Sequence, residues 1–132
     1  AILCAAELEG AETVLYTFTM QPDGSLFSGR DAAPILQSLE QAGAAAVGFN
    51  CVAADSQTAG LVSRLRRYVK GPLVCKPNAG NPVIGQDNLP HYPMTPAEFG
   101  SIMKDCYAMG AKILGGCCGT DPSFIHALVS AL

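Results

Sequence analysis

The positions of apolar residues along the chain predict a strand–helix unit that is repeated four times. Four apolar or β-branched runs are typical of strands: residues 12–20 (ETVLYTFTM), 44–51 (AAAVGFNC), 72–78 (PLVCKPN) and 111–116 (AKILGG). Apolar residues at helical spacing follow each run, over residues 30–43, 55–70, 95–110 and 121–132. The strands begin roughly 30 to 40 residues apart, which favours parallel strands joined by helices. The first ten residues are predicted to end one further helix at Gly10.

Capping residues sharpen two of these boundaries. The sequence T-P-A-E places Thr95 and Glu98 as a capping box at the start of the third helix, and Gly110 marks its end. Between the third strand and this helix lies the segment 79–94, AGNPVIGQDNLPHYPM. Its prolines and glycines predict a long loop without regular structure, and loops of this length are often functional.

This pattern predicts an α/β fold that amounts to half of a barrel. Eight strand–helix units fill the roughly 250 residues of a (β/α)8 TIM barrel, so about four such units make half of one. A three-layer α/β sandwich is the structural alternative, although no glycine fingerprint for a nucleotide follows the first strand. Half a barrel leaves two open sheet edges and an uncovered inner face. We therefore expect a missing half-barrel or another chain to cover them.

Composition and charge argue against a disordered, a nucleic-acid-binding and a membrane-spanning protein. The 132 residues suit one domain, and with 14% charged residues and a formal net charge of -3 the chain is neither disordered nor basic. Without clustered Lys and Arg we expect no nucleic-acid partner. No apolar stretch approaches about 20 residues, so we expect no membrane span. We expect a cytoplasmic protein whose Cys4, Cys75 and Cys106 are reduced and buried.

Polar residues gather at the carboxyl ends of the predicted strands. They come in pairs, one pair per strand: Thr17 and Thr19, Asn50 and Cys51, Lys76 and Asn78, Cys117 and Cys118. In a parallel barrel these ends form one rim, which is where active sites are built. For the two threonines we favour a structural role.

Three cysteines on this rim are candidates for a metal site. Cys51 and the pair Cys117 and Cys118 are far apart in sequence, but they belong to strands that lie two apart on the rim. Three thiolates with an open fourth position are the pattern of a catalytic zinc, since structural zinc sites have four protein ligands. The flanking Gly115, Gly116 and Gly119 would let both adjacent sulfurs turn to one side.

Other interpretations of the GGCCGT loop stay open at this point. A glycine-rich loop before a helix can bind phosphate through its backbone amides, as the last loops of many barrels do. A redox pair is a weaker alternative, because redox cysteines are usually separated as C-x-x-C. The remaining alternative is a non-catalytic remnant in which the loop is only a turn.

Three motifs carry a resemblance to a known family. VGFNC, KPNAGNP and GGCCGTDPSFI, in this order and each after a strand, resemble the zinc-dependent homocysteine S-methyltransferases. Within that family they look most like the homocysteine-binding domain of the cobalamin-dependent methionine synthases. The resemblance implies that residues 1–132 are a single segment, the C-terminal half of a (β/α)8 barrel domain. It also implies that Cys51, Cys117 and Cys118 are the zinc ligands.

The resemblance further implies an activity and its partners, and the sequence departs from the family pattern at one position. The expected reaction is methyl transfer to the homocysteine thiolate, giving methionine, with methylcobalamin on a separate domain or partner as the donor. Asn50 and Asn78 would orient the substrate or the site, and the chain alone is expected to be an incomplete enzyme. The family commonly has histidine where Phe124 stands, and His126 is expected on the helix surface.

Overall fold

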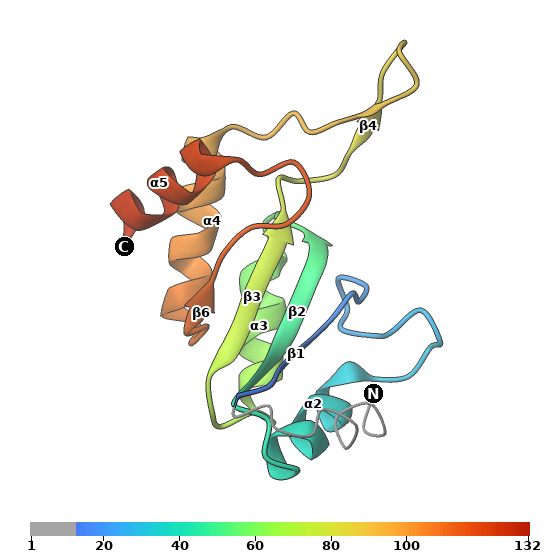
Figure 1. Cartoon of the computed structure of the whole chain (residues 1–132), viewed down its shortest axis with the longest axis vertical. Helices are drawn as coiled ribbons and strands as arrows, with labels where there is room; N and C mark the ends of the chain where they lie inside the picture. The colour runs from blue at the N-terminus through green and yellow to red at the C-terminus, as the bar shows by residue number, and fades with distance from the viewer. Residues whose placement is uncertain (1–12) are drawn as a thin grey trace.

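The computed structural model describes residues 13–132 and shows a parallel α/β fold (Figure 1). Four parallel strands form one sheet in the order β1-β2-β3-β6: β1 (Leu15–Phe18), β2 (Ala46–Ala53), β3 (Leu73–Asn78) and β6 (Ile113–Leu114). Four helices alternate with them: α2 (Ala32–Gln41), α3 (Thr58–Arg66), α4 (Pro96–Ala108) and α5 (Pro122–Ala131). The repeat predicted from the sequence is confirmed, while the predicted first helix and Cys4 lie outside the described residues.

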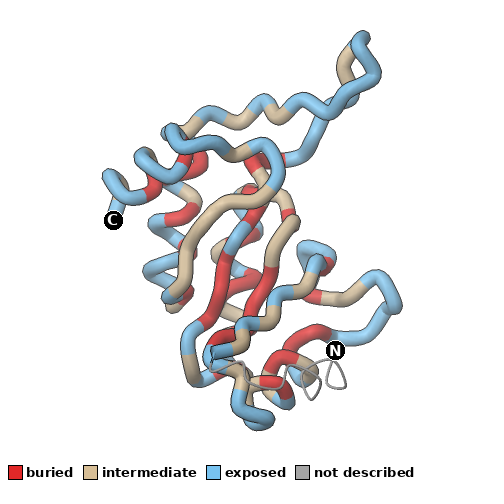
Figure 2. The backbone as a smooth tube through the Cα atoms, viewed as in Figure 1, coloured by how far each residue is buried: buried red, intermediate tan, exposed pale blue. Residues whose placement is uncertain are grey.

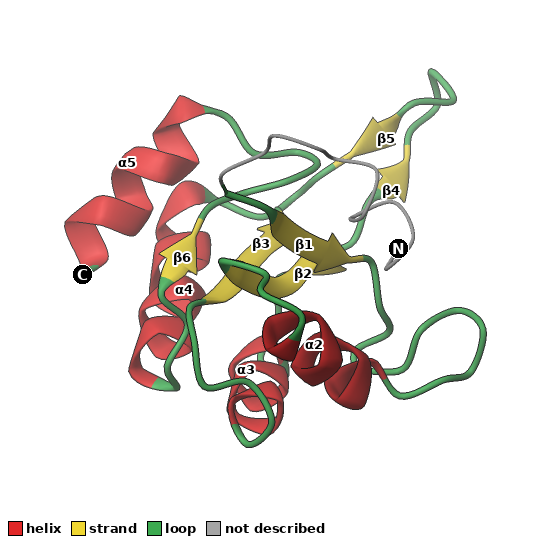
Figure 3. Cartoon of the chain, turned by 60° about the horizontal axis from the view of Figure 1, so that its bottom comes forward, coloured by secondary structure: helices red, strands yellow, loops and turns green. Residues whose placement is uncertain are grey.

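The helices cover one face of this sheet and leave the other face open. Among the described residues, α2 and α3 pack beneath the sheet, and α4 lies beside β6 with α5 against it (Figure 3). On the opposite face Leu15 is 49% exposed, and Thr17 and Lys76 are exposed as well. Alternating residues of a strand point to opposite faces, so these side chains mark the face that no described helix covers. That arrangement is the one expected of half a barrel.

The core lies between the sheet and its helices. Buried segments run along β2, β3 and the inward sides of the helices (Figure 2). Phe49 of β2, Leu65 of α3 and Met103 of α4 are fully buried there. The α4–α5 contact is made by Phe99 and Phe124, whose ring centroids are 5.5 Å apart in an edge-to-face arrangement. Edge-to-face packing of this kind stabilises aromatic pairs.

Side-chain caps explain where three of the helices begin. Asp31 accepts a hydrogen bond from the Ala33 N–H at the start of α2, and Asp121 does the same for Ser123 in α5. The predicted capping box is present at α4, where Thr95 and Glu98 bond to each other's backbone N–H groups. These bonds satisfy amide donors that have no partner within the helix.

The predicted range of α3, residues 55–70, was too long. The side chain of Asp55 accepts a hydrogen bond from the Gln57 N–H, and the Asp55 N–H donates to the Thr58 hydroxyl. These bonds form a turn before the helix, which begins only at Thr58 and ends at Arg66. A short polar side chain that bonds to nearby backbone competes with helix formation in this way.

The prediction that segment 79–94 lacks regular structure was wrong in one part. Val83–Ile84 (β4) and Pro90–His91 (β5) pair as a short antiparallel hairpin, which projects from the body of the molecule (Figure 1). Its tip is closed by a hydrogen bond from the Gly85 N–H to the Leu89 carbonyl. Pro90 is tolerated because a proline on an edge strand need not donate to a neighbour. No described helix is long and apolar enough to cross a membrane.

Candidate metal centre

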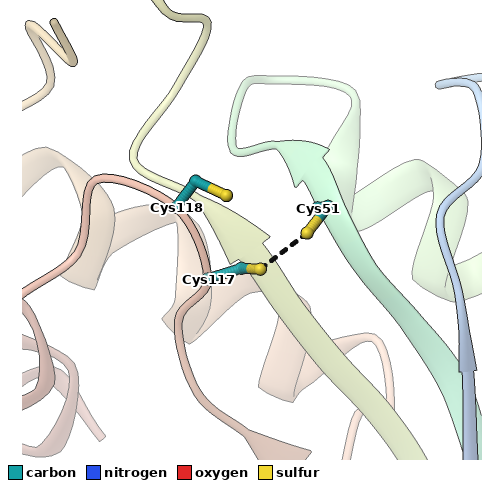
Figure 4. Close-up of side chains that lie close together, drawn as sticks. All are labelled: Cys51, Cys117 and Cys118. Atoms are coloured by element: carbon teal, nitrogen blue, oxygen red, sulfur yellow. Dashed lines mark hydrogen bonds between the residues drawn. The ribbon is translucent and has the colours of Figure 1, made fainter. Parts of the chain in front are cut away.

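The structure brings the three predicted cysteines together at the carboxyl ends of the strands. Cys51 lies in β2, and Cys117 and Cys118 lie in the loop that joins β6 to α5. The three Sγ atoms all lie within 4.8 Å of one another, and those of Cys51 and Cys117 are 2.7 Å apart (Figure 4). The sheet order places β3 between β2 and β6, so the loop reaches across the end of β3 to meet Cys51.

Cys51 adopts a backbone conformation that no sequence signal predicts. Its φ is 57°, in the left-handed region, and the pairing of β2 with β3 shifts register between Asn50 and Ala53. This irregularity breaks the alternation of side chains, so the Asn50 side-chain N–H donates to the sulfur of its own neighbour, Cys51, over 3.3 Å. A non-glycine residue in this region costs about 1–3 kcal/mol, and such residues cluster at functional sites.

Backbone hydrogen bonds hold the double-cysteine loop on the end of β3. The Cys117 N–H donates to the Pro77 carbonyl over 2.8 Å, and the Ala79 N–H donates to the Cys118 carbonyl over 2.9 Å. The Thr120 hydroxyl donates to the Cys117 carbonyl over 2.7 Å. With its backbone fixed in this way, the loop turns both sulfurs toward Cys51 (Figure 4).

Asn78 links the two sides of the cluster. Its side-chain N–H donates to the Cys51 carbonyl over 3.3 Å, and its side-chain oxygen accepts from the Cys118 N–H over 3.0 Å. The sequence singled out Asn50 and Asn78, and both lie at the cysteine cluster, half-buried. Thr17 and Thr19, by contrast, lie on and directly after the edge strand β1, where both are exposed.

The cysteines perturb one another's protonation. The hydrogen bond with Cys117, burial and the negative charges of the other two thiolates raise the pKa of Cys51 to about 11. Burial opposes ionisation of Cys117, but hydrogen bonds from Cys51 and from the Cys118 N–H lower its pKa overall. Of the two thiols, Cys51 therefore holds its proton more tightly than Cys117. A metal ion bound here would displace that proton, since cysteine coordinates as the thiolate.

The donor set fits zinc. Thiolate sulfur is a preferred ligand of zinc, with Zn–S distances of about 2.3 Å. A tetrahedron with such bonds has sulfur atoms about 3.8 Å apart; here all three sulfurs lie within 4.8 Å of one another, and the Cys51–Cys117 pair is at 2.7 Å. The three cysteines would supply three of the four ligands that zinc usually takes and would leave one position open. The cluster of Cys51, Cys117 and Cys118 can therefore bind zinc.

The other described cysteines have no part in this site. Cys75 of β3 and Cys106 of α4 are 0% exposed and lie against each other in the core. The hydrogen bond with Cys106 and burial raise the pKa of Cys75 far above its usual range, so this thiol stays protonated. Their predicted role as buried apolar residues is confirmed.

A separate pocket lies between segment 79–94 and α4. Its volume is about 750 Å³, and its lining includes Ala54, Met94 and Ile102 but none of the three clustered cysteines. The sequence did not predict it. It offers mainly apolar contacts and lacks the thiol ligands, so the chemistry is assigned to the cysteine cluster.

Sequence comparison shows the family to which the chain belongs. The family described as homocysteine S-methyltransferase matches residues 1–132, the whole chain. The chain belongs to the homocysteine S-methyltransferase family. It is 30% identical over 115 residues to a methionine synthase of Mycobacterium tuberculosis and 32% identical over 117 residues to a homocysteine S-methyltransferase of Escherichia coli. Each alignment covers 86% of this chain.

Solved structures agree with this family and fold. The metallated form of the E. coli homocysteine methyltransferase MmuM superimposes with a TM-score of 0.75 at 26% identity, and the oxidized form with 0.74 at 28%. Both comparisons cover 99% of this chain but only 41% of MmuM. Likewise, the chain spans 10% of the mycobacterial methionine synthase and 37% of the E. coli enzyme. It corresponds to part of a barrel of this family.

Proposed function

We propose that this chain supplies the zinc-binding half of a barrel that transfers a methyl group to the thiolate of homocysteine and so forms methionine. The observation that carries the proposal is the convergence of Cys51, Cys117 and Cys118 from two strand ends, with all three sulfurs within 4.8 Å of one another. Family membership supports the identity of the acceptor, homocysteine. Because the chain spans 41% of MmuM, we assign the activity to the completed barrel and not to these residues alone.

The residues of the chain would contribute by holding and orienting the site. Cys51, Cys117 and Cys118 would hold zinc, which when bound supplies a Lewis acid that keeps a coordinating thiol deprotonated at neutral pH. Asn78 fixes the backbone of Cys51 and Cys118, and Asn50 donates to the Cys51 sulfur. We also assign Asn50 and Asn78 a role in orienting homocysteine, because both contact the cysteine cluster. Displacement by a thiolate needs no general acid or base from the protein.

The methyl donor is proposed to be methylcobalamin on a separate domain or partner. The similarity to methionine synthase over most of the chain supports this assignment, as does the KPNAG motif. The remaining half of the barrel, or another chain in its place, would cover the open face marked by Leu15 and Lys76. We place this reaction in the cytoplasm.

The loop geometry argues against the phosphate-binding alternative. Four of the backbone N–H groups that a phosphate would need already have protein acceptors. Those of Gly115 and Cys117 donate to the carbonyls of Cys75 and Pro77. The Cys118 N–H donates to Asn78, and the Thr120 N–H donates back to the loop. A phosphate-binding loop requires several free N–H groups that converge on one point. In this loop most backbone N–H groups already donate to acceptors in β3 or in the loop itself.

The test is homocysteine binding to the metal-loaded, full-length protein. With cobalt(II) in place of zinc, a thiol that enters the open position adds a sulfur-to-cobalt absorption band. Homocysteine is expected to change that band in a saturable way, whereas homoserine, which lacks the thiol, is not. Inorganic phosphate serves as the competing probe. Saturable phosphate binding without any response to homocysteine would contradict the proposal.

A further inference from the structure

Tyr92 contacts the double-cysteine loop from outside the metal-ligating set. It directly follows β5, is half-buried, and packs its ring against the backbone of Gly119. A methyl group at Gly119 would overlap the Tyr92 ring, and Gly119 also has a left-handed φ of 76°. The contact therefore depends on glycine at the residue that follows Cys118.

Cys118 is the cysteine that most needs support from outside the cluster. Cys51 and Cys117 contact each other directly and are half-buried, whereas Cys118 is exposed. Segment 79–94 contacts the loop through residues near its two ends. At its start the Ala79 N–H donates to the Cys118 carbonyl, and near its end Tyr92 packs against Gly119. The loop is therefore held between the start and the end of the same segment.

We propose that Tyr92 is a positioning residue of the metal centre, whose ring holds Gly119 against the end of β3 and so keeps the Cys118 sulfur in the cluster. This inference rests on the proposed zinc site. It assigns a function to the long segment 79–94, which carries no metal ligand of its own. Residues that orient metal ligands typically change metal affinity by about 10- to 100-fold when they are replaced.

The first test compares zinc affinities by competition with a chromogenic chelator, using the full-length protein. Tyr92→Ala removes the ring and is expected to weaken zinc binding about tenfold. Tyr92→Phe keeps the ring and is expected to remain within about threefold of the unchanged protein. Tyr107→Ala is the matched control, because Tyr107 is an exposed tyrosine near the C-terminal end of α4 and has no contact with the double-cysteine loop. Its affinity is expected to stay unchanged.

A second pair of variants tests the contact from the loop side. Gly119→Ala forces a methyl group into the Tyr92 ring, whereas Gly29→Ala places one at a similar φ of 79° with nothing within 4 Å. Both substitutions place alanine in the left-handed region and so introduce similar backbone strain. Only Gly119→Ala is expected to weaken zinc binding. In the Tyr92→Ala background the effect of Gly119→Ala should become smaller, because the two residues act through one contact.

Cobalt(II) spectra supply a readout that a general loss of stability does not move. Tyr92→Ala is expected to shift or weaken the thiolate-to-cobalt absorption band, and Tyr92→Phe to restore it. Affinity and spectrum unchanged in Tyr92→Ala would overturn the inference and leave the zinc site standing. Equal losses in Tyr92→Phe and Tyr92→Ala would overturn the role given to the ring. Failure of the unchanged protein to bind either metal would overturn the proposed function together with this inference.

Discussion

Replacing Asn78 with alanine tests how the proposed metal centre is held together. The Asn78 side chain bonds to the backbone on both sides of the cluster, at the Cys51 carbonyl and at the Cys118 N–H. Asn78→Ala leaves both backbone groups without this partner. The cysteines themselves are untouched, so any effect on the metal has to come through the position of the loop.

The expected magnitude follows from the two hydrogen bonds. Each typically contributes about 0.5–1.5 kcal/mol to folding, and a half-buried site lets water replace part of the loss. We expect the free energy of unfolding of the metal-free protein to fall by about 1–2 kcal/mol. Because Cys118 loses its link to β3, we also expect zinc affinity to fall about tenfold, the lower end of the range for residues that orient metal ligands.

Urea unfolding and chelator competition measure these two quantities separately. Asn81→Ala is the matched control, because Asn81 is exposed shortly after β3 and has no hydrogen bond to the cluster. If Asn78→Ala matched Asn81→Ala within about 0.5 kcal/mol and kept its zinc affinity, the link between Cys51 and Cys118 would have no energetic role. That result would refute the role of Asn78 in holding the Cys118 loop against β3.

Two further predictions concern the scaffold. Gly48→Ala places a methyl group against the Val74 carbonyl of the neighbouring strand, where backbone cannot yield easily, and is expected to cost about 3 kcal/mol in urea unfolding. Gly60→Ala, which meets nothing within 4 Å, should cost nothing. Hydrogen bonds from the Thr95 N–H and hydroxyl lower the pKa of Glu98. The stability that ionised Glu98 gives the folded protein is therefore fully present above the ordinary carboxyl pKa of the unfolded state. It is lost as the pH falls through the lowered pKa of the folded state. The stability difference between the unchanged protein and Glu98→Gln should change over that acidic window and be constant above it, and a difference that stays constant down to pH 2 would contradict this assignment.

Local sequence signals accounted for most of the fold. Asp31, Thr95 and Asp121 mark helix starts because a cap is a contact between residues two or three apart, which a sequence displays directly. The repeated strand–helix spacing likewise predicts the parallel sheet. The start of α3 was misplaced because Asp55 can form either a cap or a turn, and the competing bond to Gln57 decides between them.

The candidate site was predictable in its members but not in its geometry. The adjacency of Cys51 to Cys117 and Cys118 follows from strand ends that share one edge of a parallel sheet. The left-handed φ of Cys51 accompanies the register shift between β2 and β3. Glycine and asparagine are the residues that usually indicate this conformation in a sequence, and residue 51 is neither. The contact of Tyr92 with Gly119 was missed because it depends on where a 16-residue segment returns to the body of the protein.

The most direct test of the central claim is the zinc content of the purified full-length protein and of two cysteine variants. We expect about one zinc per chain in the unchanged protein, as three convergent thiolates require. Cys117→Ala should abolish this zinc, whereas Cys106→Ala, which removes a buried thiol outside the cluster, should retain it. Stoichiometric zinc that persists in Cys117→Ala, or an unchanged protein that holds none under reducing conditions, would contradict the assignment of Cys51, Cys117 and Cys118 as a zinc centre.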